Sequence, residues 1–485
     1  MKNLSNNPHI GKSPQRGDLG GRIIVLGAGE SGVGSAILLQ QLGTPVLVSD
    51  SGTIAENYKS QLRAHAIEFE ENSHERAIRI INNAKNDFSS PTIEVIKSPG
   101  IPEKTPIMEI IRQANIPVIS ELELIYSYTD AKLICITGSN GKTTTTMLIY
   151  HILKNAGLNV ALGGNVGKSV ALQIAEDLKK EKHLRTEYYV LEVSSFQLDD
   201  TYGFRADIAI MLNITPDHLD RYEYNFQNYV NSKMRMLQNM GVGDTVIFCA
   251  DDEVLVQEML PEKMEEREVF AKILSYTTQN DHTKQGFLDN KTITIQNTET
   301  FSINTTDMQL QGIHNYGNSM AAAIAAQTIN IKSDVIRESL QTFASVEHRL
   351  EKLPFTVRGV EYINDSKATN VNSTWYALES MTDNVIWIAG GTDKGNEYES
   401  LYDLAEQKVK ALICLGVDNT KLIESFSGHV PVITEAKSMR EAIEKAYEIA
   451  QKGDTVLLSP ACASFDLFKN YIDRGTQFKN CVRNL

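Results

Sequence analysis

An octet with two glycines, Thr137-Gly-Ser-Asn-Gly-Lys-Thr-Thr144, limits the fold of this chain more than any other stretch. It lies between residues 132–137, an apolar run typical of a buried strand, and residues 144–154, a run typical of a helix. Glycines let the backbone turn its N–H groups toward an anion, and the start of a helix adds partial positive charge there. The octet therefore predicts a phosphate-binding loop, although only two residues separate its glycines, fewer than usual. The alternative is a glycine-rich turn before an ordinary helix.

The side chains that follow fit the same interpretation. Lys142 can reach the outer phosphates of a nucleotide, and the Thr143 hydroxyl can ligate magnesium. Glu192 ends another strand-like run. A carboxylate at the end of a parallel strand beside a phosphate loop can also hold Mg²⁺, although an arbitrary Glu is more often a salt-bridged surface residue.

Composition excludes several classes of protein. The 485 residues are 42% hydrophobic and 22% charged, which is ordinary for a globular protein of about three domains. A net charge of −14 argues against a nucleic-acid partner, and no apolar run approaches a membrane span. The polar N-terminus has no signal-peptide core, and the five cysteines are scattered. We expect a cytoplasmic protein with reduced thiols, and a monomer.

Short apolar runs alternate with helical patterns from residue 22 onward, which predicts an α/β protein with mostly parallel sheets. We expect a flexible tail and then three domains: an N-terminal Rossmann-like domain, a central P-loop ATPase-like domain and a C-terminal Rossmann-like domain. The predicted ranges are 1–20, 21–129, 130–345 and 346–485.

The first predicted domain contains Gly27-Ala-Gly-Glu-Ser-Gly32 after a strand, and Asp50 ends the next strand. This is the dinucleotide fingerprint, with Asp50 placed for a ribose hydroxyl. A single G-x-G-x-x-G does not establish NAD, because the same turn can bind any diphosphate. With an ATP loop downstream, a diphosphate-bearing substrate is favoured over a redox cofactor.

Several polar clusters follow later strands, where α/β folds place ligands. Residues 213–221 contain His218, which is either a metal or substrate contact or a structural histidine. Three more clusters, 364–370, 390–395 and 459–464, follow strands of the third domain. The alternative is that each cluster, taken alone, is an ordinary turn-forming sequence. Lys233 lies on a predicted helix and by composition is a solvated lysine.

Together these motifs resemble the Mur ligase family over residues 20–485. The resemblance rests on the octet, on the motifs above, and on Gly163–Gly167, Gly312–Asn315 with Asn318, and Glu347–Arg349. The runs Asp365-Ser-Lys-Ala-Thr-Asn370 and Ser459-Pro-Ala-Cys-Ala-Ser464 point to the member that adds D-glutamate.

The resemblance implies a role for each matching residue. The implied catalytic residues are Lys142, Glu192, His218 and Lys233. Two magnesium ions would be held by Thr143, Glu192, His218 and a carbamylated Lys233. ATP would be held by Gly138, Asn140, Gly141, Lys142, Thr143, Thr144, Asn315, Asn318, Arg349 and Asp365. The UDP-sugar would contact Ser31, Asp50, Ser98, Gly100 and Asn165, and D-glutamate would contact Thr369, Lys394, Ser464 and Tyr471.

The implied reaction is ATP-driven amide synthesis between UDP-N-acetylmuramoyl-L-alanine and D-glutamate, through an acyl phosphate. Three residues depart from the family pattern: Glu30 in the nucleotide turn, Tyr222 where histidine is common, and Tyr471 where phenylalanine is common. The alternatives are an amide ligase for another amino acid or for folate, an NAD-dependent oxidoreductase, and a non-catalytic nucleotide-binding scaffold.

Overall fold

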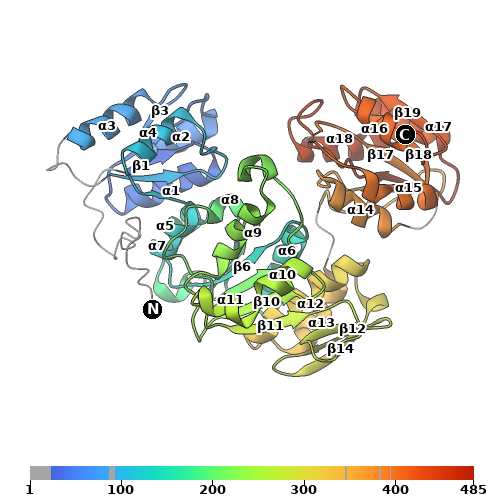
Figure 1. The fold of residues 1–485 in the computed structure, drawn as a ribbon, viewed down its shortest axis with the longest axis horizontal. Helices are drawn as coiled ribbons and strands as arrows, with labels where there is room; N and C mark the ends of the chain where they lie inside the picture. Colours follow the sequence, from blue (N-terminus) through green and yellow to red (C-terminus); the bar gives the residue numbers. More distant parts are fainter. Residues whose placement is uncertain (1–22, 87–92, 344–346, 382–383, 394) are drawn as a thin grey trace. The chain divides into compact units, whose positions relative to one another are not determined.

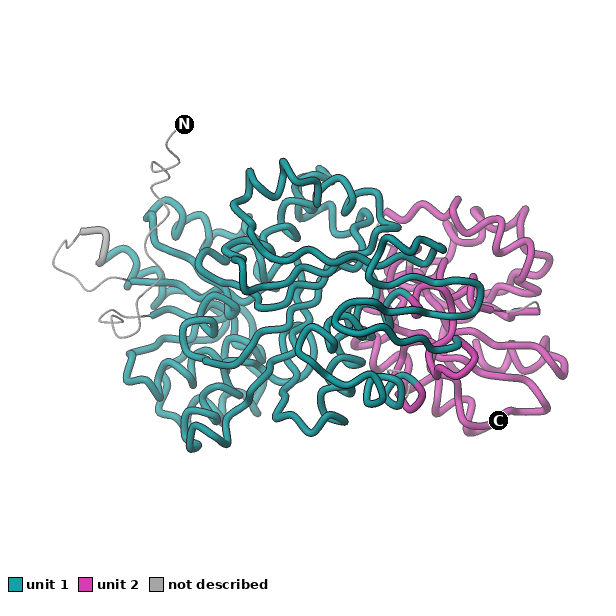
Figure 2. Tube along the Cα trace, turned by 90° about the horizontal axis from the view of Figure 1, so that it is seen from below, with its two compact units in different colours: residues 1–304, 317–340 teal, residues 305–316, 341–485 magenta. Residues whose placement is uncertain are grey.

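The computed structural model describes residues 23–86, 93–343, 347–381, 384–393 and 395–485. They form two compact units (Figure 2). The first runs up to Asn304 and includes Gly317–Leu340, and the second comprises Thr305–Tyr316 and Gln341–Leu485. The expected tail, residues 1–20, and Lys394 lie outside the described residues. The division into three domains stays a prediction.

The first sheet has five parallel strands in the order β3-β2-β1-β4-β5 (Figure 1). Apolar side chains point to both faces, since helices cover both. Ile24 and Leu26 pack with α3 and α4, whereas Ile23 and Val25 pack with α1 and α5. The elements of this part are β1 Ile23–Leu26, α1 Glu30–Gln41, β2 Val46–Ser49, α2 Glu56–Ala64, β3 Glu68–Glu70, α3 Glu75–Asn86, β4 Glu94–Lys97, α4 Pro106–Gln113, β5 Val118–Ile119 and α5 Glu121–Tyr126.

The second sheet, in the same unit, has nine strands in the order β14-β13-β12-β11-β10-β9-β6-β8-β7. The strands from β7 to β12 pair in parallel, and β13 and β14 complete the sheet as antiparallel strands. One apolar cluster continues from α1 and α5 through α7 to this sheet, so the two sheets share a core.

The elements of this part are β6 Lys132–Thr137, α6 Lys142–Asn155, β7 Val160–Gly164, α7 Val170–Leu178, β8 Tyr188–Glu192, α8 Ser195–Leu198, β9 Ile208–Met211, α9 Phe226–Met234, β10 Thr245–Cys249, α10 Glu253–Glu258, α11 Pro261–Glu266, β11 Lys272–Tyr276, β12 Gly286–Asp289, β13 Thr292–Gln296, β14 Thr300–Asn304, α12 Ile313–Thr328 and α13 Ser333–Thr342. Helix α12 begins in the second unit and continues into the first.

The third sheet lies in the second unit and has six strands in the order β15-β16-β20-β17-β18-β19. All neighbours are parallel except β15 and β16. Its two faces are covered by separate apolar clusters, one around Phe478 and one around Trp387. The elements are β15 Glu351–Lys352, β16 Glu361–Asn364, α14 Val371–Glu379, β17 Val385–Ala389, α15 Tyr402–Lys408, β18 Val409–Leu415, α16 Thr420–Phe426, β19 Ile433–Ala436, α17 Met439–Ile449, β20 Thr455–Leu458 and α18 Tyr471–Arg483.

The predicted α/β class with parallel-rich sheets is confirmed. The sequence pattern missed β3, because Glu68-Phe-Glu70 has a single apolar residue. The apolar run Ile116-Pro-Val-Ile119 predicts a strand of four residues, but β5 has only the two residues Val118–Ile119. Among the described residues, no helix combines the length and the apolar character that a membrane span requires.

Candidate active site

The phosphate-binding loop has the predicted form: β6 leads into residues 138–141, and α6 begins at Lys142. Gly141 adopts φ +80°, and a Cβ there would lie 2.5 Å from the Asn318 Oδ1 atom. Both the conformation and the space therefore require glycine. The same closeness places Asn318, one of the predicted ATP contacts, directly beside the loop.

Residues after β9 hold this loop in place. The Ser139 N–H donates to the Asn213 carbonyl at 2.9 Å, and the Asn140 N–H donates to Asn213 Oδ1 at 2.8 Å. Ser139 Oγ donates to the Thr215 carbonyl at 2.8 Å. The motif that begins at Asn213 therefore positions the backbone that would face the phosphates.

A carboxylate and a hydroxyl meet at the start of α6. Glu192, only 1% exposed, accepts a hydrogen bond from Thr143 Oγ1 at 2.5 Å. Its other oxygen accepts from Asn165 Nδ2 at 3.0 Å. The structure thus brings Asn165, predicted to contact the sugar nucleotide, together with the predicted metal ligands. Thr144 is buried in the same turn of α6.

Two lysines share one acceptor in this loop. Lys142 Nζ and Lys233 Nζ donate to the Gly138 carbonyl at 2.8 and 2.9 Å. Lys233 is on α9, as predicted, but it is 1% exposed and lies over the Tyr229 ring rather than in solvent. Burial, and then repulsion from Lys142, lower the pKa of Lys233 well below its ordinary value.

His218 is placed differently. It has φ 52° at the start of a 3-10 turn, its side chain is 41% exposed, and its ring packs edge-on against Phe196. Its Nε2 lies 3.6 Å from Asp217 Oδ2. In the described part of the chain, no group of three or more His, Cys, Asp or Glu side chains could hold a metal. The second metal site at His218 stays a prediction.

The predicted UDP-sugar residues surround the glycine turn after β1. Asp50 Oδ2 accepts from the Ala28 N–H at 2.7 Å, so Asp50 also fixes this turn. Ser98 Oγ donates to the Gly27 carbonyl at 3.4 Å, and Gly100 is exposed in the same loop. Ser31 is the second residue of α1 and donates to a buried carboxylate, Glu121.

Glu30 and Tyr222, which depart from the family pattern, each form hydrogen bonds through their side chains. The Glu30 carboxylate accepts from the Ser169 N–H at 3.1 Å and from the Tyr58 hydroxyl at 3.1 Å. These bonds satisfy its negative charge at the start of α7. The Tyr222 hydroxyl donates to Asp199 Oδ2 at 3.2 Å, and its ring stacks on Phe196.

In the second unit, the three polar clusters follow β16, β20 and β17, which are neighbours in the sheet. The Ser459 hydroxyl donates to Asp365 Oδ2 at 2.9 Å, and the Gly390 N–H donates to the Pro460 carbonyl at 2.9 Å. Burial raises the pKa of Asp365 to about 7. The predicted convergence at one sheet edge is therefore observed.

Arg349, another predicted residue of this unit, lies close to Asp365. The Arg349 cation acts on Asp365, and the Leu350 N–H donates to Asp365 Oδ1 at 3.2 Å. Asn315 Nδ2 donates to the Gln311 carbonyl at 2.8 Å. Ser464 is buried, Thr369 is half-buried, and the Tyr471 ring lies under the Lys367 ammonium.

Motif analysis missed Arg474 on α18, which is 1% exposed. Its guanidinium donates to the Ser366 carbonyl at 2.9 Å, to the Cys462 carbonyl at 3.2 Å and to the Gly390 carbonyl at 3.4 Å. Burial lowers its pKa to about 10. One arginine therefore ties together the three loops, and no sequence spacing signalled it.

Arg221 is the last residue of the motif after β9, and the structure gives it a role. Its guanidinium donates to the Pro99 and Ile101 carbonyls at 2.8 and 3.0 Å and lies over the Phe196 ring. It therefore holds the loop that carries Ser98 and Gly100.

Comparison with known proteins agrees with this geometry. The Mur ligase middle domain matches residues 136–326, and the Mur ligase glutamate ligase domain matches residues 348–462. The UDP-N-acetylmuramoylalanine–D-glutamate ligase of Bacteroides fragilis is 48% identical over 465 residues, covering 96% of this chain and 100% of that protein. The enzyme of the same name from Porphyromonas gingivalis is 50% identical over 466 residues, covering 96% and 98%.

Among solved structures, MurF from Acinetobacter baumannii has the same fold, with a TM-score of 0.59 at 14% identity, covering 95% of this chain and 93% of that one. At this identity the likeness concerns the fold alone. With relatives near 50% identical along almost the whole chain, the protein belongs to the Mur ligase family and groups with its UDP-N-acetylmuramoylalanine–D-glutamate ligases.

Proposed function

We propose that this chain joins D-glutamate to UDP-N-acetylmuramoyl-L-alanine, at the cost of one ATP, in peptidoglycan precursor synthesis. The observation that carries the proposal is the group formed by Lys142, Thr143 and Glu192 at a phosphate-binding loop, in a chain of this family. The proposed enzyme works in the cytoplasm as a monomer, with neither nucleic acid nor membrane as a partner.

The proposed chemistry has two steps. The alanyl carboxylate attacks the γ-phosphorus of ATP, ADP leaves, and an acyl phosphate forms. The amine of D-glutamate then attacks the activated carbonyl and loses a proton. The tetrahedral intermediate collapses to the amide and releases phosphate. Lys142 and the loop N–H groups offset the charge that develops on the transferring group.

Magnesium fits the oxygen donors present. The Thr143 hydroxyl and the Glu192 carboxylate are neighbours at the loop, and Mg²⁺ prefers such oxygen ligands. When bound, the ion would neutralise phosphate charge. A carbamylated Lys233 would add a further carboxylate, and the lowered pKa of this amine favours the neutral form that CO₂ requires.

The proposed pocket for D-glutamate lies at the convergent loops of the second unit, with Thr369, Ser464, Tyr471 and Lys394 as its contacts. A lysine ammonium there would pair with the side-chain carboxylate. Arg474 supports this proposal, since it ties the loops before Thr369 and Ser464 to each other.

The test is an ADP-release assay with purified protein, ATP, Mg²⁺ and UDP-N-acetylmuramoyl-L-alanine. We expect release that depends on D-glutamate, and a product whose mass has increased by one glutamyl residue. L-glutamate, L-lysine and diaminopimelate serve as competing amino acids. Turnover with lysine or diaminopimelate in place of D-glutamate would contradict the proposal.

A further inference from the structure

A fully buried carboxylate lies where three helices of the first unit meet. Glu121 begins α5 and is 4% exposed, between α1 and α7. Ser31 Oγ of α1 donates to its Oε2 atom at 2.5 Å. Ser169 Oγ and the Ala171 N–H, both at the start of α7, donate to its Oε1 atom at 2.6 and 3.0 Å. One carboxylate therefore holds groups that are far apart in the sequence.

The approach of α1 to α7 at this point is very close. A Cβ on Gly34 would lie 1.9 Å from Ser169 Oγ, so only glycine fits there. Gln41 at the other end of α1 donates to the Ala175 carbonyl at 2.9 Å. Glu30 accepts from the Ser169 N–H. Hydrogen bonds and close packing therefore connect the N-terminus of α1 directly to the N-terminus of α7.

Each of these helix starts adjoins a part of the proposed active site. Ser31 belongs to the glycine turn proposed for the UDP-sugar. The segment before α7 contains Asn165, whose backbone N–H donates to the Glu192 carbonyl at 2.8 Å and whose Nδ2 donates to the Glu192 side chain. Glu192 accepts from Thr143 in the phosphate loop. Glu121 therefore lies on a continuous path of hydrogen-bonded segments between the two regions.

We propose that Glu121 is a positioning residue: it holds Ser31 of the UDP-sugar turn against the N-terminus of α7, and thereby fixes that turn relative to the Asn165 loop. The inference rests on the proposed function. As the acceptor of the Ser31 hydroxyl proton, Glu121 leaves the lone pairs of the serine oxygen to accept a hydrogen bond from a ligand.

The matching control is Glu123 on the same helix. It is 2% exposed and accepts from the N–H groups of Tyr202, Gly203 and Phe204 at 2.8 to 3.1 Å, all in the segment between α8 and β9. Glu121→Gln and Glu123→Gln both replace a buried carboxylate by an amide of the same size. Only the first alters the partner of Ser31.

The experiment compares steady-state kinetics and calorimetric binding for both variants with the wild type. For Glu121→Gln we expect the KM and Kd of UDP-N-acetylmuramoyl-L-alanine to rise about tenfold, the effect of losing a charge-assisted hydrogen bond, with kcat within about twofold. The KM of ATP should stay near the wild-type value, because Asn165 keeps both bonds to Glu192. Glu123→Gln should leave these constants unchanged.

Thermal unfolding separates positioning from general damage. Burial, together with the nearby Glu30 charge, raises the pKa of Glu121 above its ordinary value. At a pH above the ordinary pKa of a glutamate, keeping Glu121 buried therefore lowers the free energy of unfolding. The neutral Gln removes this penalty, so the melting temperature should stay equal or rise. If Glu121→Gln weakens binding of the UDP-sugar substrate without lowering the melting temperature, the positioning role is supported. Equal losses of substrate affinity in Glu121→Gln and Glu123→Gln would overturn the inference.

A double-mutant cycle with Ser31→Ala locates the effect. If Glu121 acts through Ser31, Glu121→Gln adds little in the Ser31→Ala background. If Glu121→Gln raises the Kd of the UDP-sugar substrate by the same factor in the Ser31→Ala background as in the wild type, Glu121 acts elsewhere than on Ser31, and the inference would be overturned. The wild-type enzyme tests the proposed function separately, because its failure to release ADP with D-glutamate would be seen before any variant is compared.

Discussion

At the scale of single residues, the two lysines beside the Gly138 carbonyl bear on the proposed carbamylation of Lys233. Two ammonium groups that share one acceptor repel each other, and burial adds to the cost of charging Lys233. Conversion of Lys233 to a carbamate removes this repulsion and leaves Lys142 beside an opposite charge. The geometry therefore favours the modification that the family resemblance implies.

This argument predicts the behaviour of Lys233→Ala. Activity should fall on the order of 10²–10³-fold, as for other deletions of a charged group at a reacting site. Acetate or another short carboxylate should restore part of it by occupying the space of the carbamate. Rates measured with and without the additive test this. Lys233→Arg, which keeps the cation and cannot be carbamylated, should not be rescued, and full activity of Lys233→Ala without additive would refute the carbamate.

Asp365 gives a prediction about pH. Its pKa is raised to about 7 by burial, so the carboxyl becomes protonated as the pH falls through 7. Asp365 is proposed to contact ATP, and a protonated carboxyl would accept hydrogen bonds from it poorly, so the KM of ATP should rise about tenfold between pH 8 and pH 6. Kinetics of Asp365→Asn over the same range provide the control, because ATP itself titrates there. A wild-type profile identical in slope to that of Asp365→Asn would exclude the role of this residue.

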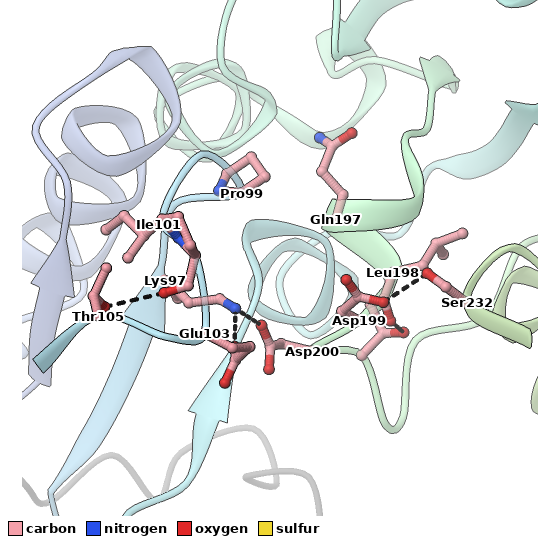
Figure 3. A network of polar contacts seen from close by, with 12 residues as sticks. Lys97, Pro99, Ile101, Glu103, Thr105, Gln197, Leu198, Asp199, Asp200 and Ser232 are labelled. Atoms are coloured by element: carbon pink, nitrogen blue, oxygen red, sulfur yellow. Dashed lines mark hydrogen bonds and ion pairs between the residues drawn. The ribbon is translucent and has the colours of Figure 1, made fainter. Parts of the chain in front are cut away.

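At the scale of elements, a buried ion network joins β4 of the first sheet to the segment after α8. Lys97 is 2% exposed, and its Nζ lies 2.8 Å from Asp200 Oδ2 (Figure 3). Glu103 also pairs with Lys97 (Figure 3). Arg112 lies 3.2 Å from Asp200 Oδ1. Lys97 is the last residue of β4, and its local sequence does not indicate a partner about a hundred residues later.

Removal of one member should therefore be costly. Lys97→Met leaves Asp200 buried with Arg112 as its remaining cation, and we expect the free energy of unfolding to fall by about 3 kcal/mol. The double variant Lys97→Met/Asp200→Leu should recover much of this loss, since no charge is then stranded. Urea unfolding of the three proteins measures both effects. A single variant as stable as the wild type would show that the pair contributes little.

Other differences between pattern and structure also belong to this scale. The short strand β3 has too few apolar residues to be recognised alone, and backbone pairing with β2 defines it. Pairing with β4 restricts β5 to two residues. The motifs after β6, β8, β9, β16, β17 and β20 were recognisable because parallel strands end in loops at one edge. Arg474 and Glu121 were not, because their partners come from several distant segments.

At the scale of the whole molecule, each compact unit has apolar clusters of its own among the described residues. The clusters around Phe478 and Trp387 contain only residues of the second unit, and the cluster around Leu191 contains only residues of the first. Cores that share no residues can unfold at different temperatures.

Calorimetry should therefore record more than one transition. Phe478→Ala creates a cavity in the second unit and should lower one transition, with a loss of about 3–5 kcal/mol, while the other stays in place. Leu191→Ala in β8 is the reciprocal control and should lower the other transition. A single transition that shifts equally in both variants would contradict the separation.

The fold class, the strand–turn–helix form around residues 137–144 and the candidate residues at strand ends could be predicted from local sequence, because apolar periodicity and glycine placement act over a few neighbouring positions. Long-range packing, in contrast, buries Lys233 beside Lys142, brings Asn165 to Glu192, and lets Glu121 and Arg474 join distant loops. Such contacts depend on how sheets and helices pack. Burial then sets the charge state of a side chain, and this is not encoded in its local sequence.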